Sequence, residues 1–288
     1  MTKVLNAFTV DVEDYYHVSG FEQHIMRDSW DSYESRVVTN THRILDLLKQ
    51  HGIHGTFFVL GWVADRFPEL VRGIHTAGHE LGSHSYWHRL VYSLTPDEFR
   101  DDLRRSKHAI EDAAGVPVTC YRAPSFSITE KSLWALQILA EEGFRVDSSV
   151  FPVRHDRYGL PGGRAEIHEI PTKSGVMIEY PLTFVGSSRY PLPVGGGGYF
   201  RLYPLWFTRK LLKRVNEYSG RPFSFYIHPW EVDPNQPRMR VGSRSSRFRH
   251  YVNLQPTVAK LSKLLADFQF GTISESIHQF LQRSRPHS

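Results

Sequence analysis

Residues 78–88 read Gly78-His79-Glu80-Leu81-Gly82-Ser83-His84-Ser85-Tyr86-Trp87-His88, a short strand-like run that ends in two histidines. If the chain turns into a helix here, His84 and His88 share one face, because side chains four residues apart are neighbours on a helix. Two imidazoles placed in this way can bind one metal ion, and zinc favours imidazole ligands. One such pair among 16 histidines is weak evidence by itself. The metal hypothesis therefore depends on other motifs that require the same ion.

The composition is that of an ordinary globular protein. The 288 residues are 40% hydrophobic and 23% charged, enough for one barrel-sized domain or two smaller ones. A net charge of +5 is too small to indicate a nucleic-acid partner, and the single cysteine excludes a disulfide framework. No apolar run approaches the roughly 18 residues of a membrane span, and the N-terminus lacks a secretory pattern. We therefore expect no transmembrane segment and a cytoplasmic location.

Strand-like and helix-like segments alternate along the chain. The predicted strands cover residues 6–12, 55–60, 80–83, 118–121, 144–146 and 223–227, with a pair of short strands around 166–171 and 176–182. The predicted helices cover residues 37–50, 64–77, 95–115, 129–142, 205–218 and 254–268. This alternation predicts an α/β fold with a parallel sheet. An incomplete or distorted (β/α)7 barrel is the favoured architecture, and an open doubly wound sheet is the alternative.

Two of these helices have recognisable start signals. Thr95 and Glu98 form a capping box, in which each side chain binds the backbone N–H of the other residue. The helix over 37–50 has several candidate caps, namely Thr39, Asn40 and Thr41. Neither an internal repeat nor a linker divides the chain. We expect a single domain over residues 1–288, with a C-terminal extension of about 229–288 packed on it.

Polar motifs follow the predicted strands at their carboxyl ends, where α/β barrels place their active sites. Besides the two histidines, they are Asp11-Val12-Glu13-Asp14, Arg122-Ala123-Pro124-Ser125-Phe126, Asp147-Ser148-Ser149 and His228-Pro229-Trp230. Carboxylates crowded at one strand end need a cation, an arginine or solvent to offset their charge. We therefore expect these motifs to share one site.

Together the motifs resemble those of the polysaccharide deacetylases of carbohydrate esterase family 4, which have the NodB-homology fold. The resemblance covers roughly residues 5 to 230, with the acidic, H-[ST]-x-x-H, R-x-P, D-x-S and terminal-histidine motifs in the family's order. One departure is that Val12 separates Asp11 from Glu13, where most of the family has adjacent aspartates. Residues 228–254 are similar to a subgroup found with bacterial exopolysaccharide-export and sorting systems.

The resemblance implies a role for each motif in metal-dependent removal of N-acetyl groups. Asp11 would be the general base, and Arg122 would hold it ionised. His228 would be the general acid, with Asp147 positioning its other ring nitrogen. The implied cofactor is a divalent ion, zinc first and cobalt or nickel as alternatives, bound by His84 and His88 together with a carboxylate.

Two neighbouring carboxylates compete for the place of the third ligand. In an extended strand Asp11 and Glu13 point to the same side and Asp14 to the other, because side chains alternate. The base and the ligand must both face the metal-bound water, which favours Glu13. If the strand ends near Glu13, however, alternation fails and Asp14 becomes the ligand.

The expected substrate is an N-acetylated polysaccharide, and we expect the aromatic side chains to lie exposed in a substrate groove. The predicted substrate-binding residues are Tyr86, Trp87, Pro124 and Trp230. Two other functions fit the same fold, namely hydrolysis of a small cyclic amide or imide, as in allantoinase-like relatives, and non-catalytic glycan binding. The arginines of residues 238–249 form either a solvated loop or a patch that meets an anionic glycan or a lipid-linked carrier.

Overall fold

The computed structural model describes residues 4–153, 159–187 and 190–284. Within them, nine strands form one sheet in the order β10-β1-β2-β3-β4-β5-β7-β6, and β11 pairs with the first residues of β1. The strands are β1 (Leu5–Val12), β2 (Thr56–Val59), β3 (Glu80–Ser83), β4 (Cys120–Tyr121), β5 (Val146–Asp147), β6 (His168–Thr172), β7 (Gly175–Glu179), β10 (Ser224–Ile227) and β11 (Gln269–Gly271). Neighbouring strands are parallel except β6 and β7, which form an antiparallel hairpin.

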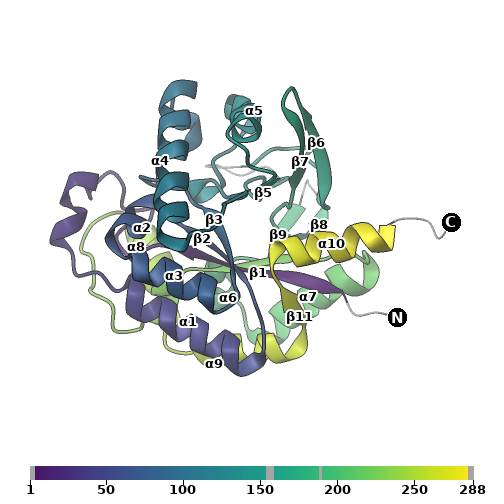
Figure 1. Cartoon of the computed structure of the whole chain (residues 1–288). Coiled ribbons are helices and arrows are strands. Elements are labelled where there is room, and N and C mark those ends of the chain that lie inside the picture. Colours follow the sequence, from purple (N-terminus) through teal and green to yellow (C-terminus); the bar gives the residue numbers. More distant parts are fainter. Residues whose placement is uncertain (1–3, 154–158, 188–189, 285–288) are drawn as a thin grey trace.

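The strand order follows the chain from β1 to β5, and β10 returns beside β1 (Figure 1). This order confirms the incomplete barrel, because a doubly wound sheet reverses its order at a switch point. The described residues 180–187 and 190–196 contact both sides of the opening in this barrel, and on the β5 side the N–H of Tyr180 donates to the carbonyl of Asp147. Thr183 Oγ1 accepts a bond from the backbone N–H of Ser224 and donates to its carbonyl, and the N–H of Tyr226 donates to the carbonyl of Gly195. Individual hydrogen bonds, rather than a continuous strand ladder, therefore join this segment to β10.

Helices lie around this sheet (Figure 1). They are α1 (Val37–His51), α2 (Gly61–Arg66), α3 (Pro68–Thr76), α4 (Pro96–Ala114), α5 (Trp134–Glu141), α6 (Gly197–Leu202), α7 (Leu205–Tyr218), α8 (Arg244–Tyr251), α9 (Thr257–Asp267) and α10 (Ile273–Ser284). Short 3₁₀ turns are η1 (Arg27–Ser32), η2 (Val91–Ser93), η3 (Pro124–Phe126), η4 (Glu130–Ser132) and η5 (Pro229–Val232), and β8 (Phe184–Ser187) pairs with β9 (Tyr190–Pro193). The predicted capping box of Thr95 and Glu98 is present at the start of α4.

Two predicted helices are broken in the structure. The helix expected over 64–77 is divided into α2 and α3 at Phe67, whose φ of −133° is not helical. The cause is Pro68, because a residue before proline is pushed out of the helical region. The helix expected over 129–142 begins as the turn η4 and continues as α5.

The segment after β10 contributes to the core. The ring of Phe8 on β1 lies 5.9 Å from that of Phe225 on β10 and 5.8 Å from that of Phe270 on β11. Ile273 and Ile277 of α10 are buried as well. The C-terminal extension therefore shares the barrel's hydrophobic core. Among the helices of the described residues, none has the length and apolar character that a membrane span needs.

Candidate active site

The carboxyl ends of β1, β3 and β10 open into one cavity of about 870 Å³. Asp11 enters it from β1 and Glu13 from the position directly after β1. His84 and His88 enter it from the loop after β3, and His228 from the end of β10. These are five of the residues that the sequence motifs single out. Parallel strands end at one edge of the sheet, so residues far apart in the chain meet there.

Glu13, His84 and His88 form a cluster that fits a divalent metal ion. Their ligand atoms all lie within 4.8 Å of one another. The carbonyl of Arg122 lies 2.8 Å from His84 Nδ1, which leaves Nε2 of that ring for an ion. Glu13 Oε2 is buried without a hydrogen-bond partner, 3.2 Å from His88 Nε2. Because a buried carboxylate oxygen is costly when unpaired, this orphaned atom fits a site for a cation.

The protonation state of the two imidazoles also suits a metal. Burial lowers the pKa of His84 and of His88 to about 4. Both rings are therefore neutral at pH 7, and the neutral imidazole is the form that binds metals.

The two histidines do not lie on a helix. Residues 84–88 form an irregular turn in which Ser85 has a φ of 66° and His88 a φ of 52°. Ser85 Oγ accepts a bond of 3.0 Å from the N–H of His88, and Asp102 of α4 accepts from the N–H groups of Tyr86 and Trp87. Non-glycine residues with positive φ are strained and persist where surrounding contacts enforce them. The helical explanation of the four-residue spacing is therefore wrong.

Asp14 lies outside the metal cluster. Its carboxylate accepts hydrogen bonds from the hydroxyl of Ser35 at 2.6 Å and from the backbone N–H groups of Arg36 and Val37 at 3.0 and 3.2 Å. It thus caps the first turn of α1, the role that the sequence assigned to Thr39, Asn40 or Thr41. Asp14 is therefore a helix cap and not the third metal ligand. The prediction that Thr39, Asn40 or Thr41 caps this helix is wrong as well.

Arg122 holds the carboxylate of Asp11 in place. This arginine is fully buried and donates from Nη1 to Asp11 Oδ1 at 2.7 Å and to Thr9 Oγ1 at 2.7 Å. Burial by itself raises the pKa of Asp11, but Arg122, then His84 and His228, outweigh it and lower this pKa below its usual value. Asp11 is therefore an ionised carboxylate next to the metal cluster, suited to accept a proton.

His228 faces the cluster with one nitrogen and the protein interior with the other. Its Nε2 lies 3.0 Å from Glu13 Oε1 and 3.9 Å from Asp11 Oδ2, and its Nδ1 lies 3.0 Å from Glu231 Oε2. Burial lowers the pKa of His228, but Glu13 and Glu231 outweigh it and raise this pKa to about 10. Its ring is therefore charged, and Nε2 carries a proton that it can donate into the cavity.

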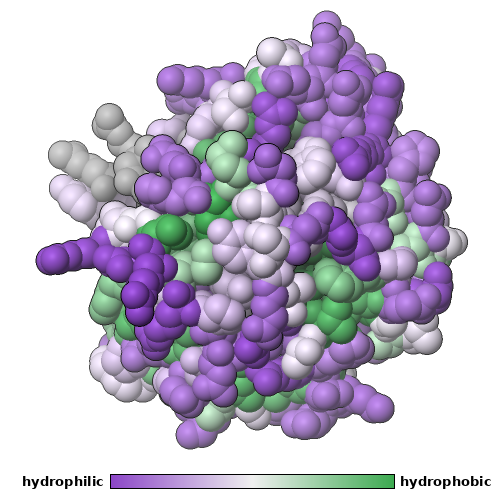
Figure 2. Space-filling model, turned by 90° about the vertical axis from the view of Figure 1, so that its left-hand side faces the viewer, coloured by the Kyte–Doolittle hydropathy of each residue, from purple (hydrophilic) through white to green (hydrophobic). Residues whose placement is uncertain are grey.

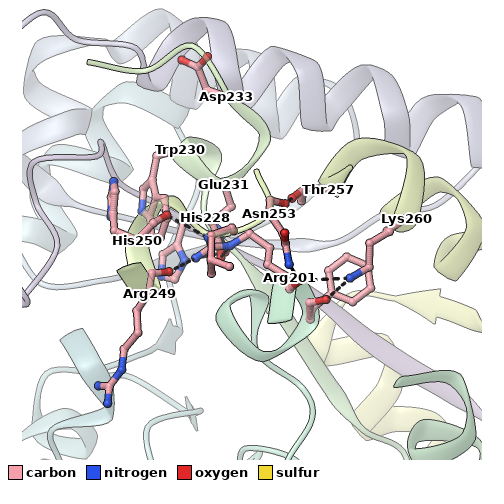
Figure 3. A network of polar contacts seen from close by, with 12 residues as sticks. Arg201, His228, Trp230, Glu231, Asp233, Arg249, His250, Asn253, Thr257 and Lys260 are labelled. Atoms are coloured by element: carbon pink, nitrogen blue, oxygen red, sulfur yellow. Dashed lines mark hydrogen bonds and ion pairs between the residues drawn. The ribbon is translucent and has the colours of Figure 1, made fainter. Parts of the chain in front are cut away.

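Glu231 forms an ion pair with Arg201 on the side away from His228, as Figure 3 shows. Arg201 Nε donates to Glu231 Oε1 at 2.7 Å, and its terminal nitrogens donate to the carbonyls of Arg249, His250 and Val252. Burial raises the pKa of Glu231, but Arg201 and His228 outweigh it and lower this pKa to about 2. Sequence reasoning missed both residues. The available signal was the His-Pro-x-Glu spacing, which predicts a capped turn.

Asp147 does not perform the role that the resemblance implied. It accepts a hydrogen bond from Ser149 Oγ at 2.5 Å, and the N–H of Val150 donates to the neighbouring carboxyl group of Glu179. Burial raises the pKa of both acids, and in Glu179 the nearby Asp147 adds to the rise. Because Glu231 occupies the place beside His228 Nδ1, Asp147 is corrected to a buried structural carboxyl group.

Two of the four predicted substrate-binding residues lie elsewhere. Tyr86 and Trp87 line a separate depression of about 480 Å³, where the guanidinium of Arg105 lies 3.8 Å from the ring centroid of Tyr86. The Tyr86 hydroxyl donates to Asp65 at 2.6 Å. Their assignment to the catalytic cavity is therefore wrong.

The other two lie at or beside the cavity, but neither is exposed. Trp230 lines it with only 5% of its surface exposed, because its ring stacks between His228 and His250, with centroids 5.1 and 4.2 Å away. Pro124 is buried at the start of η3, and the next residues, Ser125 and Phe126, line the cavity. Further lining residues that the sequence did not indicate include Tyr199, Tyr226 and Phe248, and Arg249 of the arginine-rich segment 238–249 lines the cavity as well.

The fold and site define an α/β-barrel protein with a two-histidine, one-carboxylate metal cluster beside a carboxylate and a histidine suited to acid–base chemistry. Residues 28–146 match the polysaccharide deacetylase family, and residues 148–278 match a family described as a domain of unknown function, DUF3473. The resemblance to the polysaccharide deacetylases of carbohydrate esterase family 4, the NodB-homology type, is thus confirmed for residues 28–146.

Curated relatives match over part of their length. A peptidoglycan-N-acetylglucosamine deacetylase of Bacillus cereus is 37% identical over 98 residues, which are 34% of this chain and 36% of the relative. The peptidoglycan-N-acetylmuramic acid deacetylase PdaA of Bacillus subtilis is 29% identical over 122 residues, 42% of this chain and 45% of the relative. The chain therefore matches less than half the length of either protein.

Solved structures match nearly the whole chain. A candidate polysaccharide deacetylase from Mycobacterium smegmatis has a TM-score of 0.61 at 22% identity, covering 99% of this chain and 93% of the other. The peptidoglycan deacetylase PdaC of Bacillus subtilis has a TM-score of 0.52 at 17% identity, covering 98% and 94%. At these identities the similarity establishes the fold.

Proposed function

We propose that this protein hydrolyses the N-acetyl groups of N-acetylhexosamine residues in a polysaccharide and releases acetate, with a divalent metal ion as cofactor. The observation that carries the proposal is the meeting of the Glu13–His84–His88 cluster with Asp11 and His228 in one cavity. Zinc is the first candidate, with cobalt or nickel as alternatives, because two imidazoles and a carboxylate are a ligand set typical of catalytic zinc.

Each residue then has a defined role. A divalent ion held by Glu13, His84 and His88 would polarise the acetyl carbonyl and would lower the pKa of a water molecule. Asp11 accepts the proton of the attacking water, and Arg122 keeps Asp11 ionised and oriented. His228 donates its Nε2 proton to the departing amine nitrogen. Glu231 positions that ring by accepting from Nδ1.

The cavity favours a glycan over a small cyclic amide. At about 870 Å³ it lies near the upper end of the range for small-molecule pockets. Tyr199, Tyr226 and Phe248 line it, and aromatic rings offer flat apolar surfaces against which sugars can pack. We further propose that the glycan is an exported polysaccharide, as the resemblance of residues 228–254 to the export-associated subgroup implies.

The proposal is tested by following acetate release from N-acetylated oligosaccharides before and after exhaustive chelation. Chelation should abolish release, and Zn²⁺, Co²⁺ or Ni²⁺ should restore it, since attack on the amide needs the polarised carbonyl. Full activity of metal-free protein would contradict metal dependence. Turnover of a cyclic amide alone, or oligosaccharide binding by metal-loaded protein without acetate release, would support the two alternative functions instead.

A further inference from the structure

The segment from Arg238 to Arg249 carries five arginines without a neutralising acid. The sequence has no aspartate or glutamate between Asp233 and Asp267. In the described part of the chain, none of these five arginines forms an ion pair with a carboxylate. Four of them are exposed, and Arg247 is half-buried. Their charge is thus available to a ligand.

Four of these arginines line a further hollow of about 590 Å³, distinct from the catalytic cavity and from the depression at Tyr86, and we name it the basic hollow. Its lining consists of Arg238, Met239, Arg240, Arg244, Arg247, Phe248, Tyr251 and Val252. Phe248 and Val252 also line the catalytic cavity, and so does the fifth arginine, Arg249. The two hollows therefore share a wall, and positive charge continues from one into the other.

We propose that the basic hollow binds negatively charged groups of the same polysaccharide chain whose acetyl group lies at the metal cluster, so that the substrate is an anionic glycan. This inference rests on the proposed function. Guanidinium groups bind carboxylates and phosphates by paired hydrogen bonds, so both uronate sugars and phosphodiester-linked sugars fit the chemistry.

The basic hollow is built on fixed backbone. Arg201 donates to the carbonyls of Arg249 and Val252 at 2.9 and 2.7 Å, which anchors the end of α8 (Figure 3). In the same view the Arg249 side chain extends away from this network. On the other wall, the N–H of Met239 donates to the Tyr251 hydroxyl at 2.6 Å, and the Arg238 guanidinium lies 4.9 Å from the ring centroid of Tyr251. Such support reduces the entropy lost when a ligand binds.

A polysaccharide fits this surface better than a lipid bilayer does. Figure 2 views the side of the molecule on which Figure 1 shows α8, and there strongly hydrophilic side chains surround separate hydrophobic patches. Phe248, at 60% exposed, is the one large exposed hydrophobic side chain among the residues that line the basic hollow. Insertion into a membrane interface requires a broader apolar face. A polysaccharide that extends from the catalytic cavity needs only to cross the wall that the two hollows share.

Binding of labelled oligosaccharides to the metal-loaded full chain tests the inference. The probes are an oligosaccharide that alternates N-acetylglucosamine with glucuronate, a phosphodiester-linked N-acetylhexosamine oligomer, and a neutral N-acetylglucosamine oligomer of equal length. We compare Arg240→Gln/Arg244→Gln with the control Lys213→Gln/Arg214→Gln, which removes the same charge from exposed residues of α7 that line neither hollow.

Wild-type protein should bind at least one charged probe more tightly than the neutral one, and added salt should weaken this preference. The Arg240/Arg244 variant should raise the Kd of that probe by roughly 3- to 30-fold, while the control should not. The charged probe that binds more tightly identifies the source of the anion.

Equal Kd values for all probes, or equal losses in both variants, would overturn the inference. So would an Arg240/Arg244 variant that loses only its binding to phosphatidylglycerol vesicles, since the arginines would then serve a membrane. Acetate release is measured separately. Charge-dependent binding without acetate release refutes the proposed function but supports the binding of anionic groups by the basic hollow. Acetate release without charge preference supports the proposed function and refutes the role of the basic hollow.

Discussion

Glu13 and Asp14 are adjacent in sequence, yet they contact different parts of the protein. Glu13 faces His84 and His88, whereas Asp14 caps α1. Glu13→Gln should weaken metal binding by more than the roughly 10–100-fold caused by changes to outer-shell groups. Asp14→Asn should keep its metal but lose on the order of 1 kcal/mol of stability, as helix-cap variants do. Metal content after dialysis and urea unfolding measure the two effects.

The two variants are controls for each other, because each removes one negative charge at adjacent positions. A general effect of charge on metal affinity would therefore lower metal content in both. Loss of metal in Asp14→Asn with retention in Glu13→Gln would reverse the ligand assignment.

The glycine run Gly195 to Gly198 is needed because two elements approach its backbone closely. A Cβ on Gly197, the first residue of α6, would overlap the Glu231 carboxylate, and one on Gly195 would overlap the carbonyl of Ser224. At Gly198 a Cβ meets no atom of the described chain within 4 Å. A run of four glycines is typical of a loop, whereas Gly197 and Gly198 begin α6. Only the neighbouring elements explain which of the glycines are required.

Gly197→Ala should lower stability by roughly 1–3 kcal/mol, the usual cost of overpacking, because the added methyl group displaces the Glu231 carboxylate from Arg201. Gly198→Ala should be neutral or stabilise by roughly 0.4–1 kcal/mol, because alanine restricts the unfolded chain. Thermal unfolding of both variants measures the difference. Similar Tm values for the two would show that the backbone moves to accept the methyl group.

For the whole molecule, the Arg201–Glu231 ion pair connects α6, η5 and the end of α8 within one interior. The pKa of Glu231 falls from an ordinary 4.5 to about 2 in the folded protein. A depressed folded-state pKa stabilises the protein above pH 4.5, and this contribution is lost as the pH falls toward 2. This shift in pKa corresponds to a contribution on the order of 3 kcal/mol to the free energy of unfolding.

Urea unfolding at pH 7 and pH 3, with chelator present throughout, measures this contribution. Glu231→Gln should be less stable than wild type at pH 7, because Arg201 is left buried without its partner. The difference should shrink at pH 3, where wild type loses part of its own contribution. A difference that is constant or grows on acidification would mean that Glu231 has no depressed pKa.

The sequence by itself determined most of the succession of strands and helices along the chain, the ends of several helices and most of the motifs that meet at the site. These features depend on local patterns, since a buried strand needs a short apolar run and α4 needs only Thr95 and Glu98 to begin. The convergence of Asp11, His84 and His228 followed as well, because parallel strands end at a common edge.

Only the tertiary structure decided which groups contact one another outside the regular elements. Glu231 rather than Asp147 reaches His228, and Tyr86 turns away from the cavity toward Arg105. Asp14 caps a helix that begins 23 residues later in the chain. In irregular turns the backbone has no fixed period, so side-chain directions are set by bonds to distant residues. The His-Pro-x-Glu turn has a spacing of three that can be recognised in the sequence, but bonds between distant residues leave no spacing from which they could be predicted.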